Sequence, residues 1–434
     1  MGYEEASAYL DDLGIDAMKR LKPNTARIEA LCDILNHPEA AIPAIHVTGT
    51  NGKTSTARIA SSLLAAAGLS VGTYTSPHLV SVRERLTLAG EPISEHDFGE
   101  VFDHVLPYVR HVEERLGERV TYFELLTAMF FLWAAETPVD AMVVEVGLGG
   151  RWDATNVLPS SVPVLTQVAL DHTRNLGTDR PTIAGEKAGI IKPGGAIVTA
   201  ERSPDVLAVI ADEASKMGGS VVAIGREFDL SENRIAFGGR YLSVRTSAAS
   251  YEGIFLPLHG AHQGVNAATA LEAVTRFIPA RTLDQAVVAA GLSQVEVPGR
   301  LETIRSDDAT VPVILDVAHN PDGMSALVTA LLEAFAFDRV VFVVGILADK
   351  DHRGMIAEMA RVPSRLILTQ PRSVRSTSMH DLHASAGEFG LDSEEIEGVA
   401  DAVKHALAAV EEGDLVCVTG SHYVVGEARP MLLP

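Results

Sequence analysis

Short apolar runs alternate along this chain with longer segments that have helical periodicity. In the first part of the chain, the apolar runs are residues 44–48, 141–146 and 162–168. Such an alternation is typical of parallel strands joined by crossover helices. The pattern therefore predicts an α/β fold.

Two segments between these runs have the character of helices. Apolar residues between positions 60 and 67 keep the spacing of one helix face, and Gly68 follows as a C-terminal stop. The most apolar stretch, residues 125–135, is too short to span a bilayer. We interpret it as a buried helix.

A second series of apolar runs occupies the last third of the chain. It comprises residues 313–315, 340–344, 366–368 and 415–418. Turn-forming residues around Pro298 separate the two series. We expect a first domain of residues 1–297 and a smaller α/β domain of residues 298–434. Residues 219–258 alternate more strongly and predict a hairpin-rich insert near the end of the first domain.

Composition narrows the class of protein. The chain has 434 residues, which is more than one hydrophobic core usually serves. A formal net charge of −22 argues against general binding of nucleic acid or an anionic membrane through a basic surface. The two cysteines, Cys32 and Cys417, lie in no metal-binding or disulfide pattern, and the first residues lack the features of a secretory signal. We expect a cytoplasmic protein.

The sharpest local signal is a glycine-containing loop between the first predicted strand and its helix. Its sequence is Gly49-Thr50-Asn51-Gly52-Lys53-Thr54-Ser55. Glycines let backbone N–H groups approach phosphate oxygens, the helix N-terminus favours negative charge, and the lysine reaches the terminal phosphates. A hydroxyl after the lysine can ligate Mg²⁺. The alternative, a plain strand-to-helix turn with an exposed lysine, is disfavoured by the strand and helix context, so the loop predicts ATP binding.

The shortened loop resembles the ATP site of the Mur ligases and the folylpolyglutamate synthases. Further segments match the folate enzymes of this family in the same order along the chain. They are residues 75–79 with 83–85, 145–156, 170–173 with 186–190, 262–266, 298–300, 316–321, 349–351 and 419–427. The resemblance implies a P-loop parallel-sheet ATP-binding domain followed by a smaller Rossmann-like α/β domain.

The implied activity is the ATP-dependent joining of L-glutamate to dihydropteroate or a reduced folate, through an acyl phosphate. A monomer that uses only small-molecule substrates, without nucleic acid or membrane, is expected. Thr54 follows the loop lysine where folate enzymes usually have glycine, Trp152 stands where leucine is common, and Val317 where glycine is common. Thr54 is closer to the cell-wall Mur ligases. A ligase for a cell-wall precursor, or a nucleotide-binding protein without ligase activity, therefore stays open.

Candidate metal ligands come partly from the residues and partly from the resemblance. Glu145 interrupts an apolar run near the end of a predicted parallel strand, where ligands of open α/β sheets bind. From the run alone, a magnesium ligand and an edge-exposed or helix-capping glutamate are equally good interpretations. The resemblance implies that Thr54, Ser76, Glu145 and His172 hold magnesium, with two ions in all. Histidine is an unusual ligand for this ion, which prefers oxygen.

The resemblance also implies the remaining roles. Lys53, His172 and Lys187 would be catalytic, with Lys187 carbamylated, although the residues alone favour a lysine on a solvated helix face. Beside the loop, the nucleotide would contact Asn266, Arg300, Asp316 and His319. The substrate side would comprise Ser76, Pro77, His78, Arg85, Asp153 and Ser421. We interpret Asp349, Lys350 and Asp351 as a polar loop that only ends a strand.

Overall fold

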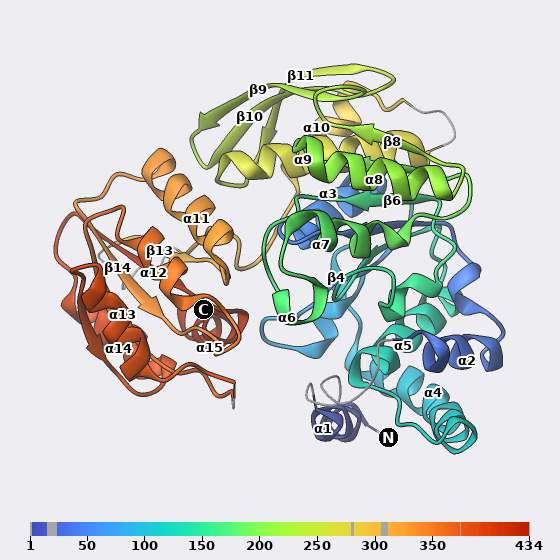
Figure 1. Ribbon diagram of the computed structural model, residues 1–434, viewed down its shortest axis with the longest axis horizontal. Helices are drawn as coiled ribbons and strands as arrows, with labels where there is room; N and C mark the ends of the chain where they lie inside the picture. Colours follow the sequence, from blue (N-terminus) through green and yellow to red (C-terminus); the bar gives the residue numbers. More distant parts are fainter. Residues whose placement is uncertain (1, 15–23, 279–281, 305–310, 374, 434) are drawn as a thin grey trace.

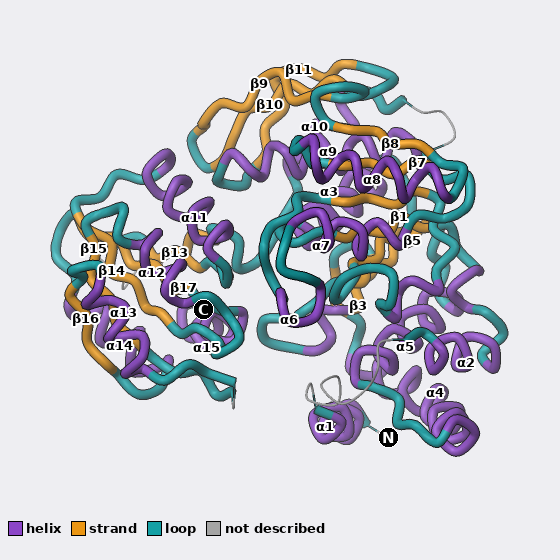
Figure 2. The backbone as a smooth tube through the Cα atoms, in the orientation of Figure 1, coloured by secondary structure: helices purple, strands orange, loops and turns teal. Residues whose placement is uncertain are grey.

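The molecule consists of two α/β domains, each built on its own sheet. The computed structural model describes residues 2–14, 24–278, 282–304, 311–373 and 375–433. Figure 1 shows the larger domain on the right, the smaller domain on the left, and an antiparallel sheet above the larger one. In Figure 2 the strands of both domains run between layers of helices. The predicted α/β class is confirmed.

The larger domain contains an eight-stranded sheet that is parallel except at one edge. In spatial order its strands are β4 (Glu91–Pro92), β3 (Leu86–Leu88), β2 (Val71–Tyr74), β5 (Ala141–Glu145), β1 (Ala44–Thr48), β6 (Val162–Leu165), β7 (Ala196–Thr199) and β8 (Ser220–Ala223). Val47 of β1 pairs with Glu145 of β5. Because both strands end here, Glu145 lies beside the start of the phosphate loop.

Helices cover both faces of this sheet. One face packs against α3 (Lys53–Ala66), α9 (Ala261–Phe277) and α10 (Gln285–Ser293). The other packs against α1 (Tyr3–Leu13), α2 (Ala26–Ile34), α4 (Glu95–Leu116), α5 (Tyr122–Glu136), α7 (Arg180–Lys187) and α8 (Pro204–Lys216). The short α6 (Thr173–Leu176) and the 3₁₀ turns η2 (Pro38–Ala40), η3 (Val82–Arg85), η4 (Ala154–Val157) and η5 (Ala188–Ile190) lie in the connections. The buried helix predicted over 125–135 is α5.

The hairpin-rich insert is real but starts later than predicted. An antiparallel sheet of β9 (Asp229–Ala236), β10 (Gly239–Arg245) and β11 (Ser250–Leu256) packs on the α9 side of the domain. Residues 220–223, which we expected in the insert, instead pair in parallel with β7. A four-residue run is too short for its sequence to separate these two pairings.

The smaller domain contains a six-stranded sheet, parallel except for its first strand. Its spatial order is β12 (Glu302–Ile304), β13 (Val313–Leu315), β17 (Asp414–Thr419), β14 (Arg339–Val344), β15 (Ser364–Leu368) and β16 (Asp392–Glu395). Its helices are α11 (Pro321–Ala334), α12 (His352–Met359) and α13 (Met379–Glu388) on one face, and α14 (Val399–Ala409) and α15 (His422–Leu432) on the other. All four strands predicted in this part of the chain are present.

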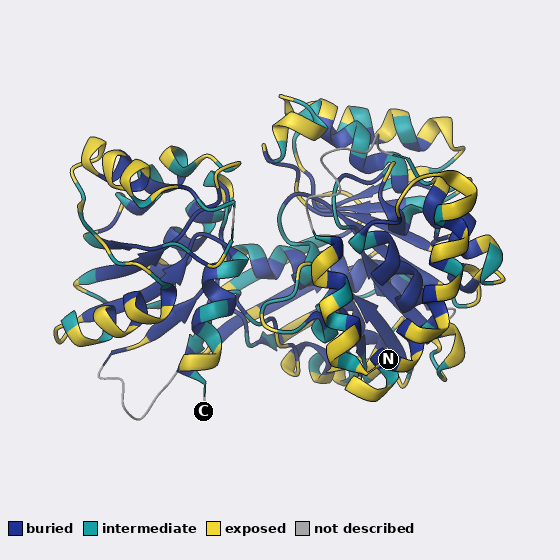
Figure 3. Ribbon diagram, turned by 90° about the horizontal axis from the view of Figure 1, so that it is seen from below, coloured by how far each residue is buried: buried dark blue, intermediate teal, exposed yellow. Residues whose placement is uncertain are grey.

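Burial follows the strands in both domains. In Figure 3 the strands are dark blue, and the exposed residues lie mostly on the outer faces of helices. The predicted strand 162–168 ends early, at Leu165, because the carbonyl of Gln167 turns to accept a hydrogen bond from the Thr50 N–H. Within the described part of the chain, no helix combines the length and apolarity that crossing a membrane requires.

Candidate active site

The phosphate loop requires glycine at two positions. Gly49 has φ +150°, and a Cβ there would lie 1.7 Å from the Thr166 hydroxyl oxygen. Gly52 has φ +88°, and its Cβ would lie 2.5 Å from Oδ1 of Asn266. A positive φ and the absence of free space both exclude a side chain. The loop therefore keeps its close approach to β6 and α9 while α3 begins directly at Lys53.

Glu145 receives hydrogen bonds from the phosphate loop and from the segment that follows β2. The Thr54 hydroxyl donates to its Oε1 over 2.9 Å, and the Ser76 backbone N–H donates to its Oε2 over 3.1 Å. Glu145 is 1% exposed. Burial raises the pKa of Glu145, and the charge of Lys53 opposes the rise. Glu145 is thus a buried carboxylate next to a lysine and two hydroxyl-bearing residues.

These residues fit a magnesium ion unequally. Thr54, Ser76 and Glu145 offer oxygen atoms next to the phosphate loop, which is the donor type that magnesium prefers. His172 offers nitrogen, and its Nε2 lies 3.4 Å from the Lys350 ammonium. The Lys350 ammonium therefore stands where a magnesium ion bound to His172 would have to lie. In this arrangement, therefore, the oxygen set fits magnesium and His172 does not.

Lys187 lies beneath the phosphate loop. Its Nζ donates to the Gly49 carbonyl over 2.7 Å, and the residue is 4% exposed. Burial, together with the charge of Lys53, lowers the pKa of Lys187 to about 7. The lysine is therefore not on a solvated helix face, and a large fraction of it is neutral near pH 7.

Asp171 joins the two domains. Its carboxylate accepts from Lys350 Nζ over 2.6 Å and from Asn320 Nδ2 over 3.2 Å, and His319 Nε2 lies 3.4 Å away. Burial by itself raises the pKa of Asp171, but the His319 hydrogen bond and the Lys350 charge outweigh it and hold the pKa well below its usual range. The carboxylate stays ionised and binds three residues of the smaller domain.

Arg300 and Asp316 face the cleft from the smaller domain. Asp316 accepts from the backbone N–H groups of Leu301 and Ala318, over 2.9 and 2.8 Å. Burial raises the pKa of Asp316, and the Arg300 charge opposes this. Among the described residues, the Arg300 guanidinium has neither a hydrogen-bond nor an ion-pair partner. It is therefore available to a negatively charged ligand.

The substrate-side residues line the cleft from both domains. Arg85 donates through Nε to His78 Nδ1 over 3.0 Å, and its guanidinium lies 5.2 Å from the centre of the Tyr122 ring. Burial, with the charge of Arg85, lowers the pKa of His78 to about 3. Ser421 donates its hydroxyl to the Gly345 carbonyl over 2.9 Å. Since that proton is used within the protein, Ser421 can only accept from a ligand.

One cleft unites nearly all of these residues. It has a volume of about 1860 Å³ and lies between the two domains. Its lining includes Thr50, Asn51, Gly52, Lys53, Thr54, Ser55, Ser76, Pro77, His78, Arg85, Glu145, Asp153, His172, Asn266, Arg300, Asp316, His319 and Ser421. Of the residues predicted from the sequence, only Gly49 and Lys187 are outside the lining, and they contact each other directly below the loop.

Two family models match the chain and together extend over most of it. The Mur ligase middle domain matches residues 47–274, and the Mur ligase glutamate ligase domain matches residues 299–422. A dihydrofolate synthase/folylpolyglutamate synthase from Mycobacterium tuberculosis is 39% identical, over 95% of this chain and 90% of its own. A folylpolyglutamate synthase from Lacticaseibacillus casei is 34% identical, over 100% and 99%.

The chain belongs to the dihydrofolate synthase/folylpolyglutamate synthase family of Mur ligases. It is therefore an ATP-dependent ligase.

Solved structures agree with this assignment. A Mycobacterium tuberculosis folylpolyglutamate synthase complexed with ADP superposes with a TM-score of 0.94 at 37% identity, covering 100% of this chain and 98% of that one. An Escherichia coli FolC in complex with DHPP and ADP gives a TM-score of 0.87 at 30% identity, covering 99% and 97%. The comparisons support the folate-enzyme interpretation over the cell-wall and non-ligase alternatives. ATP binding and small-molecule substrates follow for this ligase.

Sequence analysis missed three contributors to the site of this folate-family ligase. Lys350 was expected only to end a strand, yet it lies in the cleft between Asp171 and His172. Asn320 and Asp171 received no role either. Their positions in the sequence could have indicated a role in the site. Asn320 and Lys350 both follow the C-terminal ends of parallel strands, where ligands of such sheets bind.

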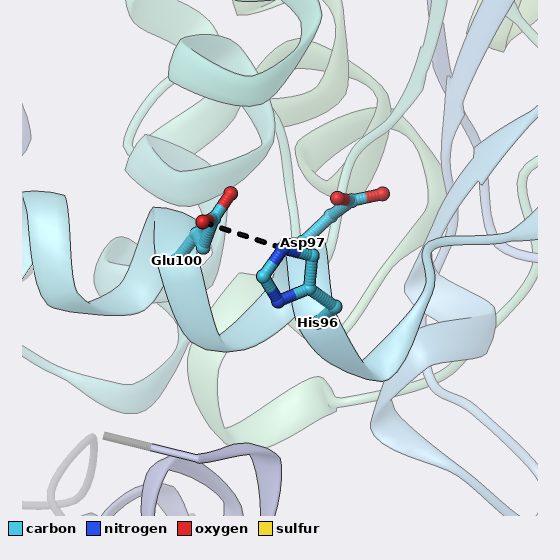
Figure 4. Close-up of side chains that lie close together, drawn as sticks. All are labelled: His96, Asp97 and Glu100. Atoms are coloured by element: carbon cyan, nitrogen blue, oxygen red, sulfur yellow. Dashed lines mark ion pairs between the residues drawn. The ribbon is translucent and has the colours of Figure 1, made fainter.

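A cluster of possible metal-binding groups also lies outside the cleft. His96, Asp97 and Glu100 are exposed near the start of α4 and have ligand atoms within 4.8 Å of one another. Figure 4 shows His96 paired with Glu100, and that distance is 3.4 Å. Exposed acidic groups of this kind are common without an ion, and none of the three residues lines the cleft.

Proposed function

We propose that this ligase joins L-glutamate to the carboxylate of dihydropteroate, a reduced folate, or both. The observation that carries the proposal is one cleft, which brings the phosphate loop, Glu145, Arg85 and Asp153 of the larger domain together with Arg300 and Lys350 of the smaller domain. The names of the relatives support this acceptor class, as does the structure of the Escherichia coli protein with DHPP and ADP.

The chemistry starts with activation of the acceptor carboxylate. A carboxylate oxygen attacks the terminal phosphorus of ATP, ADP leaves, and an acyl phosphate forms. Lys53 and the unpartnered Arg300 guanidinium are placed to offset the negative charge of the transferring group. The glutamate amine then attacks the acyl carbon, a C–N bond forms, and the C–O bond to phosphate breaks. The amine proton leaves with the released products.

The smaller domain supplies positive charge for the amino acid. The Lys350 side chain is buried and paired with Asp171, so it is a preformed cation at the cleft, and Arg85 lines the same cleft from the larger domain. Glutamate brings two carboxylates, and each requires a cation or donors to replace its lost hydration. Closure of the domains around the substrates excludes water, which would otherwise hydrolyse the acyl phosphate.

Magnesium belongs to the same proposal. Thr54, Ser76 and Glu145 would hold an ion next to the phosphates, where a divalent cation neutralises charge that develops during phosphoryl transfer. A second ion at His172 requires Lys350 to move away from its present position. We propose two ions on the strength of the family resemblance.

Carbamylation of Lys187 is a further part of the proposal. Carbon dioxide reacts with a neutral amine, and burial favours the neutral form of Lys187. The product is an anion beside the Gly49 carbonyl, so the loop backbone would have to adjust when the modification forms. That anion would draw a magnesium ion towards the terminal phosphate.

Three further expectations remain proposals. We propose a boundary between residues 297 and 298, which the separate sheets and the family-model ranges 47–274 and 299–422 support. We also propose a monomer, to be checked by light scattering, and a cytoplasmic location, to be checked by cell fractionation.

Acceptor-dependent release of ADP tests the proposed function. Purified protein with Mg-ATP and glutamate should release ADP only when dihydropteroate or a reduced folate is added. Release with a cell-wall precursor alone would transfer the assignment to that acceptor. Release that ignores every acceptor would leave only nucleotide hydrolysis.

A further inference from the structure

A buried chain of polar groups runs from the cleft wall into the central sheet. Asp153 precedes η4 and lines the cleft. The Thr155 Oγ1 lies 2.6 Å from Asp153 Oδ1, and His46 Nε2 lies 2.8 Å from the same Thr155 oxygen. Asp153 is 5% exposed, and both Thr155 and His46 are 0% exposed. Water therefore does not compete for these bonds.

The chemistry of the three groups sets the direction of each bond. An ionised carboxylate only accepts, so the Thr155 hydroxyl uses its one proton on Asp153. That oxygen then accepts from His46, which requires the proton on Nε2. The His46 Nδ1 carries no proton in this tautomer, and no described residue bonds to it. Burial, together with the charge of Lys192, lowers the pKa of His46 to about 3, so the ring stays neutral.

The result is a one-way chain that ends on Asp153. The same carboxylate also accepts from the backbone N–H groups of Leu148, over 2.9 Å, and Thr155, over 3.0 Å. These bonds fix the plane of the carboxylate, and no charged side chain among the described residues bonds to it. A leucine in place of His46 would fill similar space and avoid the unpartnered Nδ1. The histidine thus contributes a donor at a free-energy cost that packing alone does not explain.

We propose that Thr155 and His46 are positioning residues that hold the Asp153 carboxylate in the orientation needed to accept N–H groups of the acceptor's heterocycle, and so set the selectivity for the acceptor. The proposal rests on the proposed function for the class of acceptor. The proposal predicts an effect on binding of the acceptor but not on binding of ATP. The reason is that the hydrogen-bonded chain reaches Asp153 and not the residues that line the nucleotide side of the cleft.

Kinetics of a Thr155→Val variant tests the proposal. Valine keeps the shape of threonine but removes the hydroxyl that joins His46 to Asp153. We expect KM for dihydropteroate or the reduced folate to rise about tenfold or more, as for the loss of a hydrogen bond to a charged group, while KM for ATP stays unchanged. Thr155→Ser, which retains the hydroxyl, should restore the acceptor KM.

A pH profile separates positioning from a purely structural role. Loss of the Thr155 donor raises the pKa of Asp153 further above its usual range, where burial already holds it. The acid limb of kcat/KM for the acceptor should therefore move to higher pH in Thr155→Val. His46 from β1 reaches the carboxylate through Thr155. Burial raises the pKa of Tyr74 from β2 and lowers the pKa of Lys187 from α7, and the charge of Asp153 acts to raise both. In an Asp153→Asn background, the Thr155→Val change should produce no further shift.

A control variant, a substitute variant and a binding measurement accompany the Thr155→Val test. Thr275→Val alters another buried threonine, on α9, and should change neither KM. If Thr155→Val fails to fold, His46→Leu removes the donor behind Thr155, leaves the Thr155–Asp153 bond in place, and should raise the acceptor KM in the same direction. Equal acceptor KM values in wild type and variant, with wild-type turnover present, would overturn the proposal alone. If turnover is absent, calorimetric binding of dihydropteroate replaces KM, and a wild type that binds none would overturn both proposals.

Discussion

Asn51 of the phosphate loop and Asn320 of the smaller domain exchange side-chain hydrogen bonds. Asn320 Nδ2 donates to Asn51 Oδ1 over 3.1 Å, and Asn51 Nδ2 donates to Asn320 Oδ1 over 3.4 Å. Asn320 Oδ1 also caps α11 by accepting from the Gly323 N–H over 2.8 Å. The start of α11 is therefore attached to the loop that is expected to bind ATP.

Asn320→Asp should weaken the closed arrangement without removing the helix cap. Aspartate caps as well as asparagine, but it loses the donors to Asn51 and Asp171 and adds a charge beside Asp171. We expect kcat/KM for ATP to fall at least about tenfold. Steady-state kinetics and small-angle scattering, which reports a larger radius for an open form, would measure this. Ser378→Asp at the cap of α13 is the control, and an unchanged kcat/KM in Asn320→Asp would contradict the account.

Glu145→Gln should abolish most magnesium-dependent turnover. The amide keeps the size of the side chain but removes the anionic oxygen beside Thr54. Because one metal ligand and one buried charge are lost, we expect kcat to fall by about a hundredfold or more. A magnesium titration of ADP release checks it, with the exposed Glu136→Gln as the control. Turnover within a few fold of wild type would remove Glu145 from the metal site.

Carbamylation of Lys187 should depend on pH in a defined direction. Only the neutral amine reacts, and with a pKa of about 7 that form increases as pH rises from 6 to 8. A carbonyl signal in ¹³C NMR, after incubation with labelled bicarbonate, should therefore be strong at pH 8 and weak at pH 6. Lys187→Ala should lack the signal, and Lys192→Ala should keep it. A signal that persists in Lys187→Ala would place the modification elsewhere.

A second contact between the domains lies away from the cleft. Arg240 of β10 donates to Glu333 near the end of α11 over 3.3 Å, and the rings of His259 and Phe335 lie 5.0 Å apart. The side chain of Arg240 is 5% exposed and is also held by Asn233. The three-stranded sheet therefore contacts the same helix whose opposite end meets the phosphate loop.

Glu333→Gln should raise KM for ATP slightly and should leave the stability of each domain unchanged. The pair is partly exposed, so its loss is worth at most about 1 kcal/mol, or roughly a fivefold rise in KM for ATP. Glu388→Gln, which breaks an exposed pair with Arg353 inside the smaller domain, should leave KM unchanged. If both variants behave alike, the contact has no influence on closure.

The sequence predicted the strands and the loop that depend on a local pattern of residues. Strands β5 and β14 contain the continuous apolar runs 141–144 and 340–344, and the phosphate loop carries its own glycines. Strand β2 was missed because it contains Gly72 and Thr73, whose hydroxyl is hydrogen-bonded to that of Ser61 on the neighbouring α3. A local pattern cannot reveal such a tertiary contact.

The interdomain part of the site was less predictable. Asp171 and Lys350 are 179 positions apart, and nothing near either residue indicates the other. Arg85 was expected only on the substrate side, and the structure places it against His78 and Tyr122. The Asp171–Lys350 contact arises from the packing of one domain on the other, and the Arg85 contacts arise from packing within the larger domain, so both require coordinates.

Transfer of oxygen from the acceptor to phosphate tests the central claim most directly. Dihydropteroate labelled with ¹⁸O in its carboxylate, incubated with Mg-ATP, glutamate and this ligase, should give a product that contains one added glutamyl residue. One labelled oxygen should remain in that product and the other should appear in inorganic phosphate. Unlabelled phosphate, or no glutamyl product with either dihydropteroate or a reduced folate, would contradict ligation through an acyl phosphate.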